Sequence, residues 1–245
     1  MKLLQIVKYH LMSRSRSTKY DLFLAQTCID KSSQLLDVGV ADTEYSPYDN
    51  FLEKHYPYSE NITALSIFPL DEFRKRYPKV KTVVFQGGIF PFADNQFDIV
   101  HSNAVIEHVG SFEQQIDFVK EFVRVARTFY FTTPSRFFPV ETHTNLLMLH
   151  YLPKVIFDRI LLMFGKSWAT GSYMNLLSKG DIVRLMKYAG VADYRIFTKR
   201  LLGFPLHYIV VGQKVLSDNM TVAGTKSRII IDNRMSPSGG NAVKS

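Results

Sequence analysis

Two short apolar segments, each ending in small and polar residues, constrain the fold of this chain most strongly. The first, Leu35-Leu36-Asp37-Val38, is followed by Gly39, and the second, at 97–102, is followed by Asn103 and Ala104. Short apolar runs bounded by turn residues are typical of buried strands. In an open α/β sheet, ligands bind in the crevice outside the carboxyl ends of such strands. The pair therefore predicts an enzyme-like crevice that holds a nucleoside-bearing cofactor.

Strand-like and helix-like segments alternate along most of the chain. The helical periodicity is clearest at 112–125, where apolar residues recur on one face. This alternation is typical of a doubly wound, mostly parallel sheet. The last two strands are expected to form a hairpin-like edge. Helices are expected at 50–55, 69–77, 112–125 and 181–188, and strands at 34–38, 61–67, 82–85, 97–102, 128–132, 194–197 and 207–211.

The regular pattern is interrupted at three places, which defines the expected domain organisation. Residues 1–33 resemble a helical preface, and 34–216 form the main α/β domain. Residues 137–178, apolar and aromatic, are expected to be a helical cap inserted after strand five. Residues 217–245 are polar and rich in Gly and Ser towards their end, which is typical of a flexible tail. The apolar patch at 229–231 gives that tail a point at which to dock.

Composition excludes several classes of protein. The 245 residues contain one cysteine, Cys28, so no disulfide can form within the chain. The formal charge is +8, but the basic residues are scattered and no aromatic residues alternate with them, so nucleic-acid binding is not expected. The chain shows no secretory pattern and no apolar run long enough to span a bilayer. We therefore expect a cytoplasmic protein.

The motifs together resemble those of class I S-adenosylmethionine-dependent methyltransferases, most closely the small-molecule branch that includes the quinone-pathway enzymes. The resemblance covers about residues 33–213 and implies a seven-stranded Rossmann-like sheet with S-adenosylmethionine as cofactor. No single motif is specific, but the combination is. The motifs are Asp37-Val38-Gly39, Phe90-Pro91-Phe92-Ala93-Asp94, Phe97-Asp98-Ile99-Val100 and Ala104-Val105-Ile106-Glu107-His108-Val109.

The resemblance implies cofactor contacts at the ends of four strands. The turn after strand one has one glycine where relatives usually have two or three, and strand two ends in a serine where an acidic residue usually binds the ribose. A glutamine, whose side-chain carbonyl can accept a hydrogen bond from the adenine amine, ends strand three. The implied cofactor-binding residues are Asp37, Gly39, Ala41, Ser66, Gln86, Gly87, Gly88, Ser102 and Asn103.

On the acceptor side, the resemblance places Glu107 and His108 beside the methyl-transfer crevice. His108 is the candidate catalytic residue, as general base or substrate anchor; the alternative is that it only packs. Glu141, His143 and His150 are polar groups in the apolar cap and are the candidate substrate contacts; the alternative is that Glu141 and His143 pair with each other. Some relatives hold a metal near Glu107, but Ala104 replaces the further carboxylate, so no metal is expected.

The expected function is methyl transfer from S-adenosylmethionine to a small-molecule or lipid- or sugar-linked acceptor. The cap is read as core packing, as a pocket for an apolar substrate, or as a contact with a membrane surface. A nicotinamide-dependent oxidoreductase would need Gly-x-Gly-x-x-Gly after strand one, which is missing. The remaining alternative is a degenerate methyltransferase fold that binds or scaffolds without catalysis. The sequence does not predict the oligomeric state.

Overall fold

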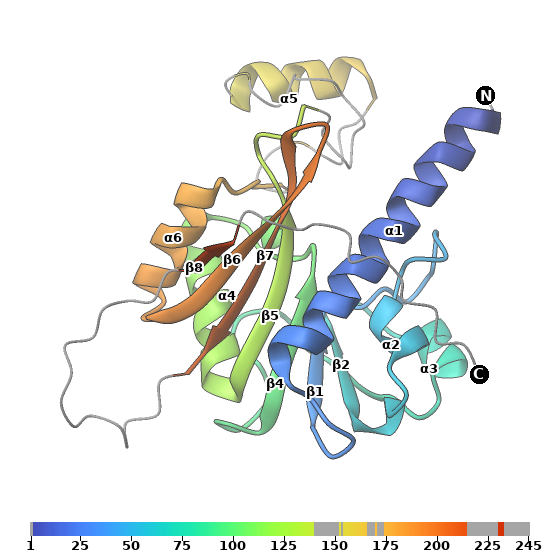
Figure 1. Ribbon diagram of the computed structural model, residues 1–245, viewed down its shortest axis with the longest axis vertical. Coiled ribbons are helices and arrows are strands. Elements are labelled where there is room, and N and C mark those ends of the chain that lie inside the picture. Colours follow the sequence, from blue (N-terminus) through green and yellow to red (C-terminus); the bar gives the residue numbers. More distant parts are fainter. Residues whose placement is uncertain are drawn as a thin grey trace, which may run out of the picture.

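The computed structural model describes residues 2–139, 152, 154–165, 170, 174–214 and 230–232. These residues form one sheet with helices on both of its faces (Figure 1). The helices are α1 Lys2–Thr27, α2 Phe51–His55, α3 Asp71–Arg76, α4 Phe112–Val125, α5 Lys154–Met163 and α6 Lys179–Tyr188, with 3₁₀ turns η1 Ser59–Asn61 and η2 Ile106–His108. The strands are β1 Leu35–Val38, β2 Ile62–Ser66, β3 Lys81–Val84, β4 Phe97–Asn103, β5 Ala126–Pro134, β6 Asp193–Leu201, β7 Phe204–Gln213 and β8 Ile230–Asp232.

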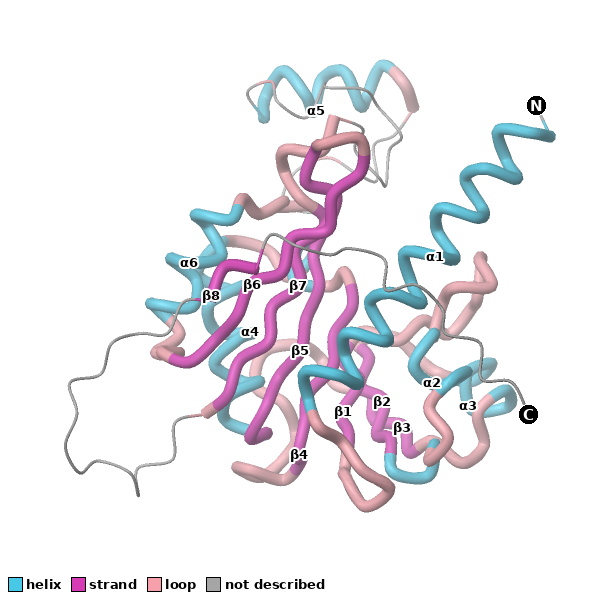
Figure 2. The backbone as a smooth tube through the Cα atoms, viewed as in Figure 1, coloured by secondary structure: helices cyan, strands magenta, loops and turns pink. Residues whose placement is uncertain are grey.

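The strand order is β3-β2-β1-β4-β5-β7-β6-β8 (Figure 2). The first five strands are parallel, whereas β7 runs antiparallel to both β5 and β6. The sheet is therefore mixed, with the seven predicted strands in place and the predicted hairpin formed by β6 and β7. An eighth strand, β8, pairs in parallel with β6, so part of the segment expected as a flexible tail joins the sheet.

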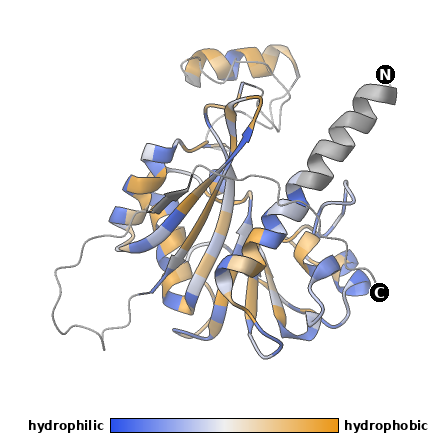
Figure 3. Ribbon diagram, in the orientation of Figure 1, coloured by the Kyte–Doolittle hydropathy of each residue, from blue (hydrophilic) through white to orange (hydrophobic). Residues whose placement is uncertain are grey.

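Each face of the sheet has its own hydrophobic core. On one face, α4 and α6 cover the strands, and Val119, Phe122 and Leu185 are fully buried. On the other face, α1, α2 and α3 pack through Phe23, Leu52 and other apolar side chains. Burying one such side chain stabilises the fold by about 1.5–3 kcal/mol, so α1 is anchored through Phe23. In Figure 3, hydrophobic and hydrophilic positions alternate along α4 and α6, as expected for helices with one buried face.

Two helices begin with a capping box. Ser111 and Gln114 form a capping box at the start of α4, and Ser178 with Asp181 forms another at the start of α6. In each, the serine hydroxyl accepts from a backbone amide that has no partner within the helix. Helix α4 begins at Phe112, as predicted, whereas α6 begins at Lys179, two residues before the predicted start at 181.

The predicted cap is described only in part. Its described helix, α5, is largely hydrophobic and lies beyond the end of the sheet at which β6 and β7 turn (Figures 1 and 3). Phe157 and Leu161 of α5 are buried. Three residues of the cap to which the sequence assigns a substrate role, Glu141, His143 and His150, lie outside the described residues.

Candidate functional site

The site is centred on the carboxyl ends of β1 and β4, which are neighbours in the sheet. Asp37 of β1 and His101 of β4 are partners in the strand register, so their side chains project from the same face. Asp37 Oδ1 lies 2.8 Å from His101 Nδ1. The helical layer of α1 and α2 covers this face. A buried polar pair therefore lies directly beneath the expected cofactor crevice.

His101 is enclosed by aromatic rings. It stacks on Tyr130 of β5 with ring centroids 5.5 Å apart and meets the edge of Phe23 of α1 at 5.1 Å. Burial lowers the pKa of His101 to about 4, so the imidazole is neutral at neutral pH. A neutral ring that donates its Nδ1–H to Asp37 satisfies the 2.8 Å contact.

Asp37 has a second carboxyl neighbour, Glu53 of α2. Both side chains are buried, and burial raises the pKa of Asp37 to about 7 and that of Glu53 well above its ordinary value, with the charge of Asp37 adding to the shift of Glu53. Neither Glu53 oxygen accepts a hydrogen bond from another described residue. If both carboxyl groups were ionised, neither could donate a hydrogen bond to the other. Once protonated, Glu53 can donate to Asp37. At neutral pH the pair therefore holds at least one proton.

Two hydrogen bonds made by the side chain of Asn50 fix the conformation of the loop after β1. Asn50 Oδ1 accepts from the Ala41 backbone amide at 2.9 Å, and Asn50 Nδ2 donates to the Ala41 carbonyl at 2.8 Å. Gly39 has a φ of +89°, and a Cβ there would overlap Val105 Cγ2. Glycine is thus required by the backbone conformation and by the close approach of Val105.

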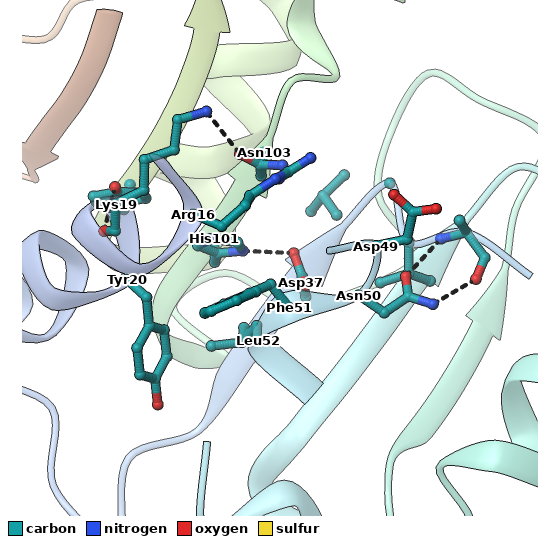
Figure 4. Close-up of a pocket in the computed structure, with 15 residues that line it drawn as sticks. Arg16, Lys19, Tyr20, Asp37, Asp49, Asn50, Phe51, Leu52, His101 and Asn103 are labelled. Atoms are coloured by element: carbon teal, nitrogen blue, oxygen red, sulfur yellow. Dashed lines mark hydrogen bonds and ion pairs between the residues drawn. The ribbon is translucent and has the colours of Figure 1, made fainter. Parts of the chain in front are cut away.

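Helix α1 closes the site from above. The Tyr130 hydroxyl donates to the Lys19 carbonyl at 2.8 Å, which ties the helix to β5. The side chains of Arg16 and Lys19 point into the same space as Asn103 (Figure 4). Lys19 Nζ lies 3.4 Å from Asn103 Oδ1 and 3.5 Å from Thr132 Oγ1. The N-terminal helix is consequently part of the site.

These elements enclose a cavity of about 130 Å³ (Figure 4). Its residues come from α1, the end of β1 with the following loop, the start of α2, the end of β4 and the middle of β5. The lining residues are Arg16, Lys19, Tyr20, Asp37, Val38, Gly39, Val40, Ala41, Asp49, Asn50, Phe51, Leu52, His101, Asn103 and Tyr130.

Four of the predicted cofactor residues line this cavity: Asp37, Gly39, Ala41 and Asn103. A fifth, Ser102, is buried beneath it, and its hydroxyl donates to the Val38 carbonyl at 3.1 Å. Ser102 thus joins β4 to β1 without lining the cavity. The four lining residues come from segments that are far apart in the sequence and meet only in the sheet.

The other predicted cofactor residues lie at the ends of β2 and β3, outside the cavity lining. The Ser66 hydroxyl accepts from the Phe68 backbone amide at 3.0 Å, so it is engaged in its own turn. Gln86, Gly87 and Gly88 are exposed after β3. Since β2 and β3 are the outer strands on this side of the sheet, this part of the expected binding site lies beside the cavity rather than in it.

The polar residues after β4 face different surroundings. Glu107 is fully buried and accepts from the Thr133 hydroxyl at 3.0 Å, whereas His108 is half-buried. Neither lines the 130 Å³ cavity. Ala104 has a φ of +58°, a strained conformation for a residue with a Cβ. This backbone conformation turns the chain at the end of β4 and places the side chain of Val105 against Gly39.

A second cavity, of about 290 Å³, lies between α5 and the starts of α4 and α6. It is lined by Phe112, Gln115, Arg136, Leu152, Phe157, Met174, Asn175, Leu176, Leu177, Asp181 and Arg184. Within the described part of the chain, no three His, Cys, Asp or Glu side chains are grouped to hold a metal ion. No helix among those residues is both long and apolar enough to cross a membrane.

Sequence reasoning missed the contributions of α1, α2 and the middle of β4. The relevant signal in α1 is the spacing of Arg16, Lys19 and Phe23, which places two cations and an anchoring aromatic residue on one helical face. His101 gave a weaker signal, since it is a polar residue within an apolar strand. Glu53 gave one as well, as an acidic residue on the buried face of a short helix.

Comparison with known proteins is consistent with this geometry. Residues 36–128 match the protein family described as "Methyltransferase domain". This segment contains Asp37, Gly39, Ala41, Glu53, His101 and Asn103, but not α1. No curated protein sequence matches the chain.

Solved structures similar to this chain show the same fold. A protein of Galdieria sulphuraria, taken to be a sarcosine dimethylglycine methyltransferase, is 16% identical, with 82% of this chain and 86% of that chain covered and a TM-score of 0.55. The YcgJ protein of Bacillus subtilis is 11% identical, with 81% and 98% covered and a TM-score of 0.51. A methyltransferase of Thermotoga maritima is 14% identical, with 86% and 95% covered and a TM-score of 0.50.

The matches bear out the sequence prediction at the level of fold and domain. Residues 36–128 match a methyltransferase domain, and the fold is shared with solved methyltransferases, so the protein is an enzyme with S-adenosylmethionine as its cofactor.

Proposed function

We propose, from the methyltransferase domain at residues 36–128, that this protein transfers a methyl group from S-adenosylmethionine to a small-molecule or a lipid- or sugar-linked acceptor. The observation that carries the proposal is the cavity at the carboxyl ends of β1 and β4. An open α/β sheet binds its ligand at this edge. Asp37, Gly39, Ala41 and Asn103 meet there.

The residues present fit such a cofactor. Asp37 offers a buried carboxyl group for an ammonium group, and the Gly39 turn leaves backbone exposed beside the cavity. The serine at the end of β2 and the glutamine after β3 replace the usual acidic contacts, so we propose that Ser66 and Gln86–Gly88 hold the ribose and adenine along the open edge of the sheet. The cofactor supplies a methyl group already activated on a sulfonium, so no protein nucleophile is needed.

The protein's own residues then provide alignment and exclusion of water. Helix α1 covers the methionine end of the crevice, since Lys19 and Arg16 line the cavity from that side. We propose His108 as the group that takes the proton from the acceptor, and Glu107 as its neighbour on the acceptor side. Glu107 is buried and bonded to Thr133, which fixes the turn that presents His108.

The segment 137–178 is proposed to cover the acceptor. The 290 Å³ cavity has both polar and apolar lining residues, and Leu152, Phe157 and Met174 from this segment form part of its apolar side. This apolar side supports an aromatic or lipid-linked acceptor of the kind that quinone-pathway methyltransferases use. Within the same proposal, Glu141, His143 and His150 contact the acceptor. The exposed apolar side chains of α5, such as Val155 and Met163, support a peripheral contact of this segment with a membrane surface, from the cytoplasmic side.

The experiment is calorimetric titration with S-adenosylmethionine and S-adenosylhomocysteine, followed by a screen of phenolic, sugar and lipid-linked acceptors for added methyl groups by mass spectrometry. Binding that is lost in Gly39→Trp, with methylation of one acceptor class, would establish the function. Binding without turnover on any class would favour the second candidate, a degenerate binding or scaffold protein. The serine at the end of β2 and the single-glycine turn after β1 favour that candidate.

A further inference from the structure

Two cationic side chains from α1 enter the cavity side by side. Arg16 and Lys19 are three residues apart, so they lie on the same face of the helix. Lys19 has only 6% of its surface exposed, and Arg16 is half-buried. Both line the cavity together with Asn103 and Asp37 (Figure 4).

Neither cation is matched by an anion. The two acceptors of Lys19 Nζ, Asn103 Oδ1 and Thr132 Oγ1, are neutral and distant at 3.4 and 3.5 Å. No hydrogen bond or ion pair to the Arg16 guanidinium occurs within the described part of the chain. A buried charge of this kind is costly unless an opposite charge or a set of hydrogen bonds compensates it.

The nearest carboxylates are engaged elsewhere. Asp49 Oδ2 accepts from the backbone amides of Tyr45 and Ser46 at 2.9 Å each, which shapes its own loop. Asp37 Oδ1 contacts His101 at 2.8 Å. These charges attract Arg16 across the cavity without contacting it. The space between the two cations and Asn103 is therefore positively charged and accessible from the cavity.

The electrostatics of the two groups agree with this geometry. Burial lowers the pKa of Arg16, and burial together with the charges of Arg16 and Lys199 lowers the pKa of Lys19 well below its ordinary value. Glu107 acts in the opposite direction on both groups, but more weakly. An added negative charge would relieve this repulsion, whereas a neutral or cationic group would not.

We propose that Arg16 and Lys19 form an oxyanion-binding site in the cavity, which takes a carboxylate or phosphate group of a ligand. Two sources fit this chemistry: the carboxylate at the amino-acid end of the cofactor, in which case the inference rests on the proposed function, and an oxyanion of the acceptor. Both residues lie outside the matched segment 36–128. They reach the cavity because α1 is held on the sheet by buried Phe23 and by the hydrogen bond from the Tyr130 hydroxyl to the Lys19 carbonyl.

The test is calorimetric binding of three probes to the full chain. S-adenosylhomocysteine carries the carboxylate, 5′-methylthioadenosine lacks the amino-acid part, and inorganic pyrophosphate represents an acceptor oxyanion. The variants are Arg16→Gln and Lys19→Met, and the control is Lys31→Met, which removes an exposed charge outside the cavity. Thermal melting of each variant reports its folding, and Lys19→Met is expected to melt above the native protein because it removes a buried charge.

A cofactor source predicts that each cavity variant weakens S-adenosylhomocysteine binding by about tenfold or more, as expected for loss of a charge-assisted hydrogen bond, with 5′-methylthioadenosine and the control unaffected. An acceptor source predicts unchanged S-adenosylhomocysteine binding and loss of pyrophosphate binding. Equal binding of all three probes by native protein and folded cavity variants would overturn the oxyanion site. A native chain that binds pyrophosphate through Arg16 and Lys19 but no S-adenosylhomocysteine would refute the proposed function alone.

Discussion

Asp37 and His101 are register partners in adjacent parallel strands, and their side chains meet at 2.8 Å beneath the cavity. Glu53 adds a second buried carboxyl group beside Asp37, and Tyr130 and Phe23 pack against the ring of His101. The floor of the site is thus a buried polar network with a raised carboxyl pKa and a lowered imidazole pKa.

Binding of S-adenosylhomocysteine is expected to strengthen with pH through the titration of Asp37. Burial raises the pKa of Asp37 to about 7, and only its ionised form attracts the ligand's ammonium group. Affinity should therefore rise from about pH 6 to 8 and then level off, changing by up to tenfold per pH unit below the pKa. His101, with its pKa near 4, stays neutral throughout this window. Calorimetry across this range measures the effect.

Asp37→Asn is the matched variant for that experiment. It keeps the size of the side chain but cannot ionise, so its affinity should be lower at pH 8 and independent of pH. A native profile that is flat, or a sloping profile that persists in Asp37→Asn, would show that Asp37 does not control binding.

Glu53→Gln is expected to stabilise the protein in a pH-dependent way. Because the folded-state pKa of Glu53 is raised, the native protein has its full stability below the unfolded pKa, near 4.5, and loses stability as the pH rises towards the folded value. Glutamine avoids this loss. The gain should be absent near pH 4 and grow by up to about 1.4 kcal/mol per pH unit above it.

Urea unfolding of Glu53→Gln at several pH values measures this gain. Glu60→Gln, which changes an exposed glutamate on η1, is the control and should match the native protein. Equal free energies of unfolding for Glu53→Gln and the native protein at pH 8 would contradict a buried, protonated Glu53.

Gly39→Ala is expected to destabilise the protein for two separable reasons. The φ of +89° strains any residue with a Cβ, and that Cβ overlaps Val105. Gly203 has a φ of +84° with open space around it, so Gly203→Ala reports the backbone strain alone, about 1 kcal/mol. Gly39→Ala should cost about 2–4 kcal/mol, the excess coming from overpacking.

A double-mutant cycle with Val105→Ala isolates the steric part. Removing the Val105 methyl groups should recover most of the excess cost in Gly39→Ala, measured as free energy of unfolding. If the changes in the free energy of unfolding of the two substitutions are strictly additive, glycine is required at position 39 by the backbone conformation alone.

Asn50→Ala and Asn50→Gly together test the bridge to Ala41. Both lose the two bonds of 2.9 and 2.8 Å, so both should weaken S-adenosylhomocysteine binding to a similar extent. Asn50 has a φ of +50°, which glycine tolerates, so Asn50→Ala should be the less stable by about 1 kcal/mol. Native-like affinity in both variants would show that the loop holds its shape without the bridge.

His108→Ala tests the proposed proton acceptor once an acceptor is found. Loss of a general base should lower kcat by about 10²–10⁴-fold while affinity for S-adenosylhomocysteine stays unchanged, because His108 does not line the cavity. A pH–rate profile that keeps its shape, with kcat near the native value, would remove His108 from the mechanism.

Local signals in the sequence predicted most secondary structure. The strands β1, β2, β4 and β5 are short apolar runs, and α4 follows from its apolar periodicity. The eighth strand was not predicted as an element, because an Ile-rich patch of three residues forms a strand only where an edge is available for pairing.

For the site, the sequence alone determined the strand ends that carry Asp37, Gly39, Ala41 and Asn103, because polar and small residues after buried strands leave a local mark. Only the tertiary structure decided that Arg16 and Lys19 lie above them and that Glu53 and His101 meet Asp37. The local sequence pattern around these residues would be the same if they lay on an exposed surface, so it does not predict that they are buried. Their burial depends on where α1 and α2 dock, which is a balance of long-range packing that no short segment encodes.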